Sequence, residues 1–154
     1  MPQSAHFSPN GDCEQIITAL IGAAKRTIRI LMYELTSPDL VQVLTAAARR
    51  GVDVQVIIDK REASGRDAQV LTLQKAGVPL LEDGAHAIMH SKYCIIDGAT
   101  LITGSYNWTW AAEHLNAENV IISDDIPLVA AYAQNYALHL SHSAKMDAQE
   151  PQDA

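Results

Sequence analysis

Apolar and polar positions along the chain follow two periods, one typical of strands and one typical of helices. Strand-like runs cover residues 5–8, 27–35, 52–58, 79–81, 93–96, 100–103 and 118–122. Helical spacing covers residues 12–24, 37–50, 67–76, 107–115 and a last segment that Asp124 caps and that extends to Leu140. The apolar side of this last segment is predicted to hold Ile126, Val129, Ala130, Ala133, Tyr136, Ala137 and Leu140. Helices that separate strands are typical of an α/β layer fold. We therefore expect an α/β sandwich with a mixed, largely parallel central sheet flanked by helices.

Local signals define several boundaries within this pattern. Ser37-Pro38-Asp39 offers an N-cap, a first-turn proline and an early acid, so a helix begins there and ends before Gly51. The segment KREASGR at 60–66 predicts a polar loop. Asp97-Gly98 lies between two short apolar runs and predicts a tight β-hairpin.

Length and composition predict one domain. The chain has 154 residues, of which 48% are hydrophobic and 19% charged, which is enough to bury one core. We place the domain at residues 1–142 and a polar, frayed tail at 143–154. No apolar run approaches the roughly 20 residues that cross a bilayer, so no stable membrane insertion is expected. The net charge of -7 means that any site for a polyanion must be local.

One stretch, HSKYCIIDGATLITGSYNWT, holds the candidate chemistry. Cleavage of a phosphodiester needs an attacking group, an acid for the leaving oxygen and a cation that neutralises the phosphoryl oxygens. His90 can attack phosphorus, and Lys92 lies on the same side of a strand, where it can hold the nonbridging oxygens. These two residues are therefore the predicted catalytic pair.

Polar residues after this pair complete the predicted site. Gly104 permits close approach of the backbone, and the Ser105 hydroxyl and Asn107 amide can donate to phosphate oxygens. Asp97 falls at the hairpin turn, where an Asp-Gly pair is favoured for backbone reasons, so we predict a structural role for it. Glu118 begins the next strand and is the candidate carboxylate that orients the His90 ring.

The spacing H-x-K, then Asp five residues after the lysine, then G-S-x-N resembles the HKD signature of the phospholipase D superfamily. With SPD at a helix start and RRGVDVQVIID, the resemblance to small single-motif bacterial endonucleases of that superfamily extends from Phe7 to Leu140. It implies a phospholipase D-like sandwich and phosphodiester hydrolysis through a phosphohistidine, without a metal or cofactor. It also places Glu118 in the active site, and Ser105 and Asn107 in the phosphate site.

The mechanism of this superfamily uses two histidines, whereas the chain has one HKD motif. A homodimer with the active site at the two-fold axis would supply the second histidine from its symmetry mate. The alternative acid within the chain is His86, four residues before His90. A zinc site of His86, His90 and Cys94 is a further alternative, which the strand-like sequence around Cys94 argues against.

Nucleic acid, DNA or RNA, is the expected substrate, and phospholipid head groups are the alternative. The candidate contacts to a polynucleotide are Lys60, Arg61 and Arg66 in a loop after a strand, and the stacking aromatic Trp108. A catalytically idle nucleic-acid-binding module is the third hypothesis, which the intact motif opposes. The resemblance favours a periplasmic or secreted protein, although the N-terminus lacks the pattern of a secretory signal.

Overall fold

The computed structural model describes residues 3–65 and 68–147. Its strands are β1 (Ser4–Ser8), β2 (Thr27–Met32), β3 (Asp53–Asp59), β4 (Leu80–Asp83), β5 (Lys92–Ile96), β6 (Thr100–Gly104), β7 (Glu118–Ser123) and β8 (Ala144–Lys145). Its helices are α1 (Cys13–Ala23), α2 (Pro38–Arg49), α3 (Lys60–Ala63), α4 (Val70–Lys75), α5 (Trp110–His114) and α6 (Ile126–His142). The strands form one sheet in the order β1-β7-β6-β5-β2-β3-β4-β8.

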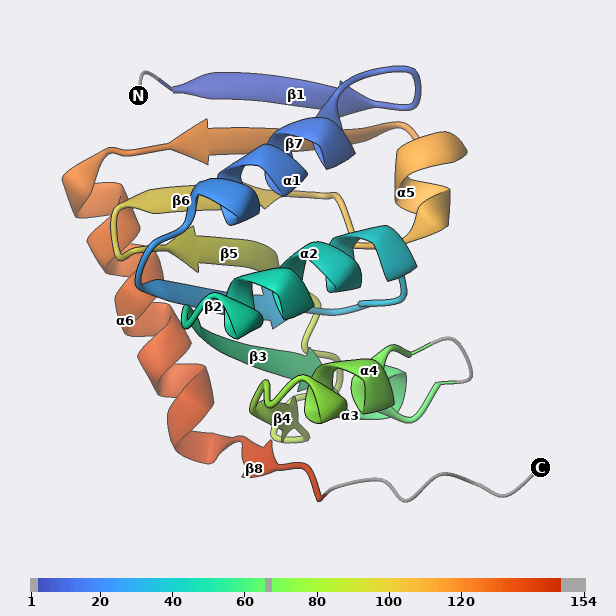
Figure 1. The fold of residues 1–154 in the computed structure, drawn as a ribbon, viewed down its shortest axis with the longest axis vertical. Coiled ribbons are helices and arrows are strands. Elements are labelled where there is room, and N and C mark those ends of the chain that lie inside the picture. Colours follow the sequence, from blue (N-terminus) through green and yellow to red (C-terminus); the bar gives the residue numbers. More distant parts are fainter. Residues whose placement is uncertain (1–2, 66–67, 148–154) are drawn as a thin grey trace.

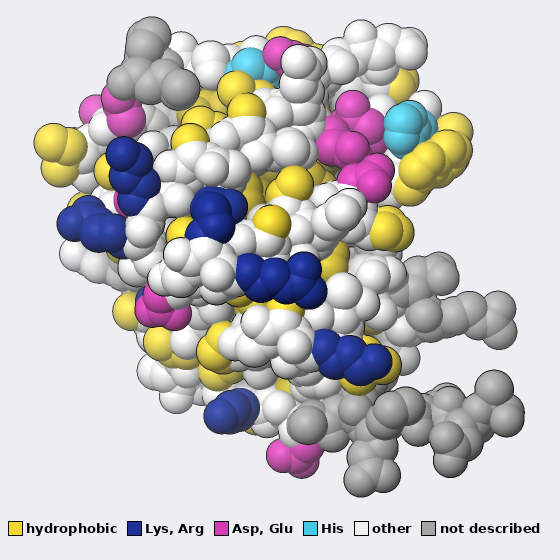
Figure 2. Space-filling view, viewed as in Figure 1, with side chains coloured by type: hydrophobic (Ala, Val, Ile, Leu, Met, Phe, Trp, Pro, Cys, Tyr) yellow, Lys and Arg dark blue, Asp and Glu magenta, His cyan; other side chains and the backbone are white. Residues whose placement is uncertain are grey.

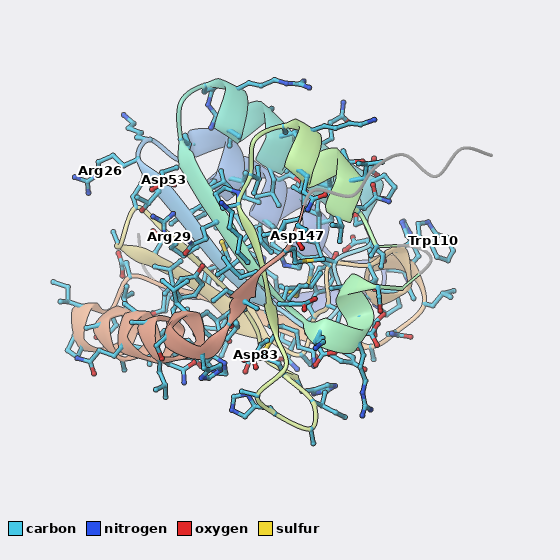
Figure 3. All side chains as sticks on the ribbon, turned by 90° about the horizontal axis from the view of Figure 1, so that it is seen from below. Arg26, Arg29, Asp53, Asp83, Trp110 and Asp147 are labelled. Atoms are coloured by element: carbon cyan, nitrogen blue, oxygen red, sulfur yellow. The ribbon has the colours of Figure 1, made fainter. Side chains whose placement is uncertain are left out.

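Helices cover both faces of this sheet (Figures 1 and 3). Successive residues of a strand point to opposite faces, and the buried strands β2 and β3 therefore contribute to two cores. Ile30 and Ile58 belong to the larger core, under α1, α2 and α4. Leu31 and Ile57 pack on the other face, where Tyr136 of α6 closes a smaller core. The expected α/β sandwich is confirmed.

The balance of strand directions differs from the prediction. The sheet is mixed, but among the described strands only the β2–β3 and β3–β4 pairs are parallel. The expectation of a largely parallel sheet was wrong, because the β5–β6 connection at residues 97–99 is too short for a crossover and makes a hairpin. The pairs β2–β5, β6–β7, β1–β7 and β4–β8 are antiparallel as well. Asp97 and Gly98 form the β5–β6 turn with φ of 55° and 63°.

Most predicted boundaries lie close to the observed ones. The Ser37 side chain accepts from the Leu40 amide and starts α2 as predicted. Residues 60–63 form a helical turn, where we predicted loop, because the Asp59 carboxylate caps it. The cap of α6 is Asp125 in place of the predicted Asp124.

The C-terminal part of the structure corrects two further expectations. The apolar side predicted for α6 is only partly buried, since Val129 and Tyr136 are buried whereas Ile126 is 81% exposed. The sheet also continues past the boundary predicted at residue 142, because β8 pairs with β4 and Met146 packs against the larger core. Within the described residues, no helix has the length and apolar character needed to cross a membrane.

Candidate active site

The motif residues other than Asp97 lie at the end of the sheet where β2 and β6 finish and β5 and β7 begin, on the right in Figure 1. Lys92, the first residue of β5, pairs with Met32, the last residue of β2. Gly104, the last residue of β6, pairs with Val120 near the start of β7. This antiparallel register brings together the segment before β5, the loop after β6 and the start of β7.

His90 and Lys92 are in direct contact. The Lys92 Nζ lies 2.8 Å from His90 Nδ1 and donates to the His90 carbonyl oxygen at 2.6 Å. The exposed His90 ring packs against Tyr33, with 4.7 Å between ring centroids, and the Lys92 ammonium lies 5.4 Å from the same tyrosine ring. An imidazole and an ammonium are thus presented side by side on an aromatic support.

Two carboxylates act on Lys92. Burial lowers the pKa of Lys92, and the negative charges of Glu118 and Glu34 oppose that change. Glu118 begins β7 and is half-buried, but within the described residues no hydrogen bond joins it to His90. The orienting role expected for Glu118 therefore stays a prediction, while its electrostatic action on Lys92 is an effect of the structure.

The sequence analysis missed Tyr33 and Glu34, which follow β2 at the same end of the sheet. Burial and the charge of Glu62 raise the pKa of the Glu34 carboxyl, while Lys92 and His90 lower it. The only signal in the sequence is their place after a buried strand, at the end where ligands gather in α/β folds.

The loop after β6 is fixed by β7. The Ser105 amide donates to the Asn119 carbonyl at 3.1 Å, and the Asn119 amide donates to Ser105 Oγ at 3.1 Å. Gly104 has φ of 156°, and a Cβ on it would lie 2.1 Å from the Asn119 carbonyl oxygen. Only glycine fits this close approach. Ser105 Oγ acts as the acceptor in its contacts with Asn119, so the proton of the Ser105 hydroxyl can be donated to a substrate.

Asn107 is oriented from the opposite direction. Its Oδ1 accepts from the Glu34 amide at 3.2 Å, so its side-chain amide has a defined orientation. Its Nδ2 donates no hydrogen bond within the described part of the chain, and that group can donate to a substrate. Ser105 and Asn107 are thus two donors held at the same end of the sheet as Lys92.

Asp97, the third letter of the motif, lies at the other end of the sheet. The five residues of β5 separate it from Lys92 by roughly 16 Å. Its carboxylate accepts from the amides of Arg26 at 2.7 Å, Lys25 at 3.0 Å and Thr27 at 3.0 Å. Burial tends to raise the pKa of Asp97, but these three amides hold it below its ordinary value. Asp97 therefore fastens the hairpin to the start of β2.

Two of the three basic candidates lie beside the site. Lys60 and Arg61 are exposed in α3, directly after β3, whereas Arg66 lies outside the described residues. Figure 2 shows further Lys and Arg side chains over the face formed by α1, α2 and α4. Arg26 and Arg50 precede β2 and β3 in the chain and therefore lie at the end of the sheet away from His90.

Trp108 does not stack on a substrate in this fold. It is 2% exposed and belongs to the larger core, which contradicts its predicted role as a nucleic-acid contact. Its carbonyl accepts from the Thr36 and Ser37 amides, so it anchors the start of α2. Trp110 is 59% exposed, and its ring packs on His114 of the same helix with 4.7 Å between ring centroids.

The alternatives that involve His86 are not assembled at this site. Cys94 is fully buried within the larger core, so His86, His90 and Cys94 do not form the alternative zinc site. The His86 ring contacts Asp83 at 3.2 Å.

An open pocket of about 430 Å³ adjoins Lys92 between β5, β6 and α6, with Tyr132 and Asn135 on the helix side.

Comparisons with known proteins show to which family the chain belongs. Residues 17–139 match the family described as "Cardiolipin synthase, PLD-like domain". The chain is 34% identical over 122 residues to a mitochondrial cardiolipin hydrolase of Xenopus laevis, covering 79% of this chain and 58% of that protein. It is 34% identical over 133 residues to a phospholipase D of Rickettsia bellii, covering 86% of this chain and 66% of that protein. The chain thus spans less than two thirds of these relatives.

Solved structures of similar size match along nearly their whole length. Nuc from Salmonella typhimurium, a phospholipase D family member, has a TM-score of 0.86 and 33% identity, with 94% of this chain and 97% of that chain covered. NucT from Helicobacter pylori has a TM-score of 0.85 and 24% identity over 94% and 98% of the two chains, which supports the fold alone. The family match over residues 17–139 and the shared fold show that the chain belongs to the phospholipase D superfamily and has the fold of its phosphodiesterases.

Proposed function

We propose that the chain is a metal-independent phosphodiesterase that cleaves nucleic acid as a homodimer. The observation that carries the proposal is the convergence of His90 and Lys92 with the donors Ser105 and Asn107 at one end of the sheet. This set offers a nucleophile, a cation and two hydrogen-bond donors for one phosphodiester group.

The reaction proceeds in two displacements. A His90 ring nitrogen attacks phosphorus, a P–N bond forms and the P–O bond to the leaving group breaks. The departing oxygen takes a proton from the His90 of the symmetry mate. That second imidazole then removes a proton from water, which attacks the phosphohistidine and releases free His90 and the phosphate product.

Exposed apolar side chains at the site end support the dimer. Ile88 is 52% exposed two residues before His90, and Leu115, which follows α5, is 66% exposed. Apolar groups exposed around a functional site are typical of contact surfaces. A two-fold axis beside His90 would bury them and bring the two imidazoles to one phosphate.

Nucleic acid is favoured over lipid by the groups around the site. The cations of Lys60 and Arg61 are exposed at the carboxyl end of β3, where they can follow a phosphate backbone. Exposed Trp110 offers a surface on which a base can stack. Hydrolysis of phospholipid is the second candidate, because the curated relatives are named cardiolipin hydrolase and phospholipase D.

One assay separates these candidates. Purified protein in EDTA is incubated with supercoiled plasmid, single-stranded RNA and phosphatidyl ester vesicles. We expect the wild type to cleave nucleic acid and His90→Asn to be inactive. The control variant His6→Asn changes a histidine in β1 and should cleave at the wild-type rate. Nicking of plasmid by His90→Asn at the wild-type rate would overturn the assignment, and release of lipid head groups alone would favour the second candidate.

The dimer and the covalent step need their own measurements. The chain has a mass of 16.7 kDa, and light scattering should give twice that value. Quenching with detergent at alkaline pH during turnover of a phosphorus-labelled substrate should leave label on His90, and that label should be stable in alkali and lost in acid. Full turnover by a monomer would exclude the shared site, and absence of label under single-turnover conditions would argue against the phosphohistidine.

A further inference from the structure

Three of the six histidines in the chain gather around one buried carboxylate, apart from the catalytic pair. Asp83 is the last residue of β4, His86 lies in the loop that follows, and His139 and His142 lie in the last turn of α6. One ligand atom from each of the four residues lies within 4.8 Å of all the others. Figure 3 shows Asp83 between the end of α6 and that loop.

The contacts within this cluster all meet at the carboxylate. Asp83 Oδ2 lies 2.7 Å from His139 Nδ1 and 3.0 Å from His142 Nε2. Asp83 Oδ1 lies 3.2 Å from His86 Nδ1 and accepts from the Ala85 amide at 3.0 Å. The three imidazole rings also pack on one another, with centroids 5.1 Å to 5.3 Å apart.

The surroundings of the cluster attract a cation. The Asp83 side chain is fully buried and that of His139 is 12% exposed. Its carboxylate oxygens face the three imidazoles and the Ala85 amide. The carboxylate lies beside the C-terminal end of α6, where the helix dipole is negative.

We propose that Asp83, His86, His139 and His142 form a structural zinc site. Three imidazole nitrogens and one carboxylate oxygen suit a cation of borderline softness, and four protein ligands match the closed tetrahedral coordination of structural zinc. Bonds of about 2.0–2.1 Å place tetrahedral ligand atoms about 3.3 Å apart, so atoms that lie within 4.8 Å of one another approach by about 1.5 Å at most when the ion binds.

Binding requires no other reactant. The ring nitrogens that face Asp83 exchange their hydrogen bond for a bond to the metal. Each neutral imidazole keeps its proton on the nitrogen that faces away, and any proton carried by a charged ring is released to solvent. The Asp83 carboxylate supplies a negative charge that compensates part of the charge of the ion.

The site would connect two distant parts of the chain. It joins the end of α6 to the loop that leads from β4 to His90, and the same loop is held by the Met89 amide, which donates to Asp59 Oδ2 at 2.8 Å. The metal shares no residue with the predicted catalytic set. We therefore expect it to stabilise the fold and the loop before His90, with the phosphodiester chemistry left to His90 and Lys92.

The test uses the full chain without a polyhistidine tag, stripped with EDTA and transferred to buffer free of chelator. Zinc chloride is titrated in competition with a chromophoric chelator, and melting is measured with and without zinc. We expect one zinc ion per chain, a higher melting temperature in zinc, and visible absorption typical of tetrahedral coordination when Co²⁺ replaces zinc. His139→Gln and His142→Gln should each weaken zinc binding at least about tenfold.

His6→Gln is the matched control, because it also removes a hydrogen bond between a histidine and an aspartate, at 2.9 Å from Asp12. It should bind zinc like the wild type. X-ray absorption of zinc-loaded wild-type protein tests the ligands without any variant and should find three imidazoles. The proposal is overturned if the wild type takes up no zinc, if the double variant His139→Gln/His142→Gln keeps wild-type affinity, or if absorption finds fewer than three imidazoles.

Discussion

Replacing Asp97 by Ala tests whether the third letter of the HKD motif serves stability or chemistry. Asp97 lies roughly 16 Å from Lys92 along β5, and its carboxylate binds the amides of three consecutive residues, 25–27. Asp97→Ala should therefore lower the free energy of unfolding and leave the chemical step unchanged in protein that is still folded.

The expected loss follows from the contacts. The bond from the Thr27 amide is partly buried and contributes about 1 kcal/mol, and the exposed bonds from Lys25 and Arg26 contribute about 0.5 kcal/mol each. Ala at φ of 55° adds about 1 kcal/mol of backbone strain. The sum is about 3 kcal/mol, which corresponds to a melting temperature about 6–12 °C lower for a domain of this size.

Asp97→Asn separates charge from geometry. Asparagine tolerates the positive φ and keeps Oδ1, which accepts from Arg26 and Thr27, but it loses the negative charge. Because the pKa of Asp97 is lowered in the fold, its carboxylate stabilises the protein above the unfolded pKa of about 3.9. That contribution disappears as pH falls through the lower folded value, so wild type and Asp97→Asn should converge in stability in acid.

Urea denaturation gives the free energy of unfolding of each variant, and cleavage of an activated phosphodiester at 25 °C gives the rate of turnover. Lys92→Ala is the comparison: it should abolish turnover and change stability little. Loss of turnover in Asp97→Ala that still shows the native circular dichroism, with a stability change below about 0.5 kcal/mol, would refute this interpretation of the motif.

Four further substitutions test other parts of the site. Gly104→Ala should lower the free energy of unfolding by about 1–3 kcal/mol and slow cleavage, because the alanine Cβ would lie 2.1 Å from the Asn119 carbonyl oxygen in β7. Thermal melting and cleavage kinetics measure the two effects. Trp108→Ala should lower the free energy of unfolding, measured in urea, by about 3–5 kcal/mol because Trp108 is buried. Trp110→Ala should change that free energy by no more than about 0.5 kcal/mol, but it should weaken the binding of a fluorescent oligonucleotide. Glu34→Gln removes a charge that raises the pKa of Lys92, so the alkaline limb of the pH–rate profile should move to lower pH. Unchanged binding in Trp110→Ala, or an unmoved alkaline limb, would contradict these expectations.

Local signals in the sequence were sufficient for most elements. The cap at Ser37 and the Asp97-Gly98 turn were predicted because each depends on residues adjacent in the chain. The direction of β5 relative to β2 could not be predicted in this way, since it depends on which strands meet in the sheet. The parallel sheet was predicted from apolar runs, which are also typical of buried antiparallel strands.

The candidate site shows the same limit. His90 and Lys92 are two residues apart, so strand geometry alone places them together. Glu34 reaches this pair only through the pairing of β2 with β5, and no local pattern marks it. Trp108 and Trp110 are similar in sequence context, but Trp108 forms a β-bridge with Leu35 and is buried, whereas Trp110 is exposed. The cluster at Asp83 combines two pairs of residues, Asp-x-x-His and His-x-x-His, from distant segments.

Chelation separates the chemistry proposed at His90 from the zinc site proposed at Asp83, because the two proposals predict changes in different quantities. Metal-independent cleavage predicts that folded protein in EDTA turns over at the wild-type rate. A structural zinc ion predicts that EDTA lowers the melting temperature, and that His139→Gln melts at nearly the same temperature with or without zinc. Activity lost in EDTA only near that melting temperature would fit both proposals. Activity lost well below it, and restored by zinc, would mean that the metal takes part in the reaction and that His90 does not act by the metal-free route.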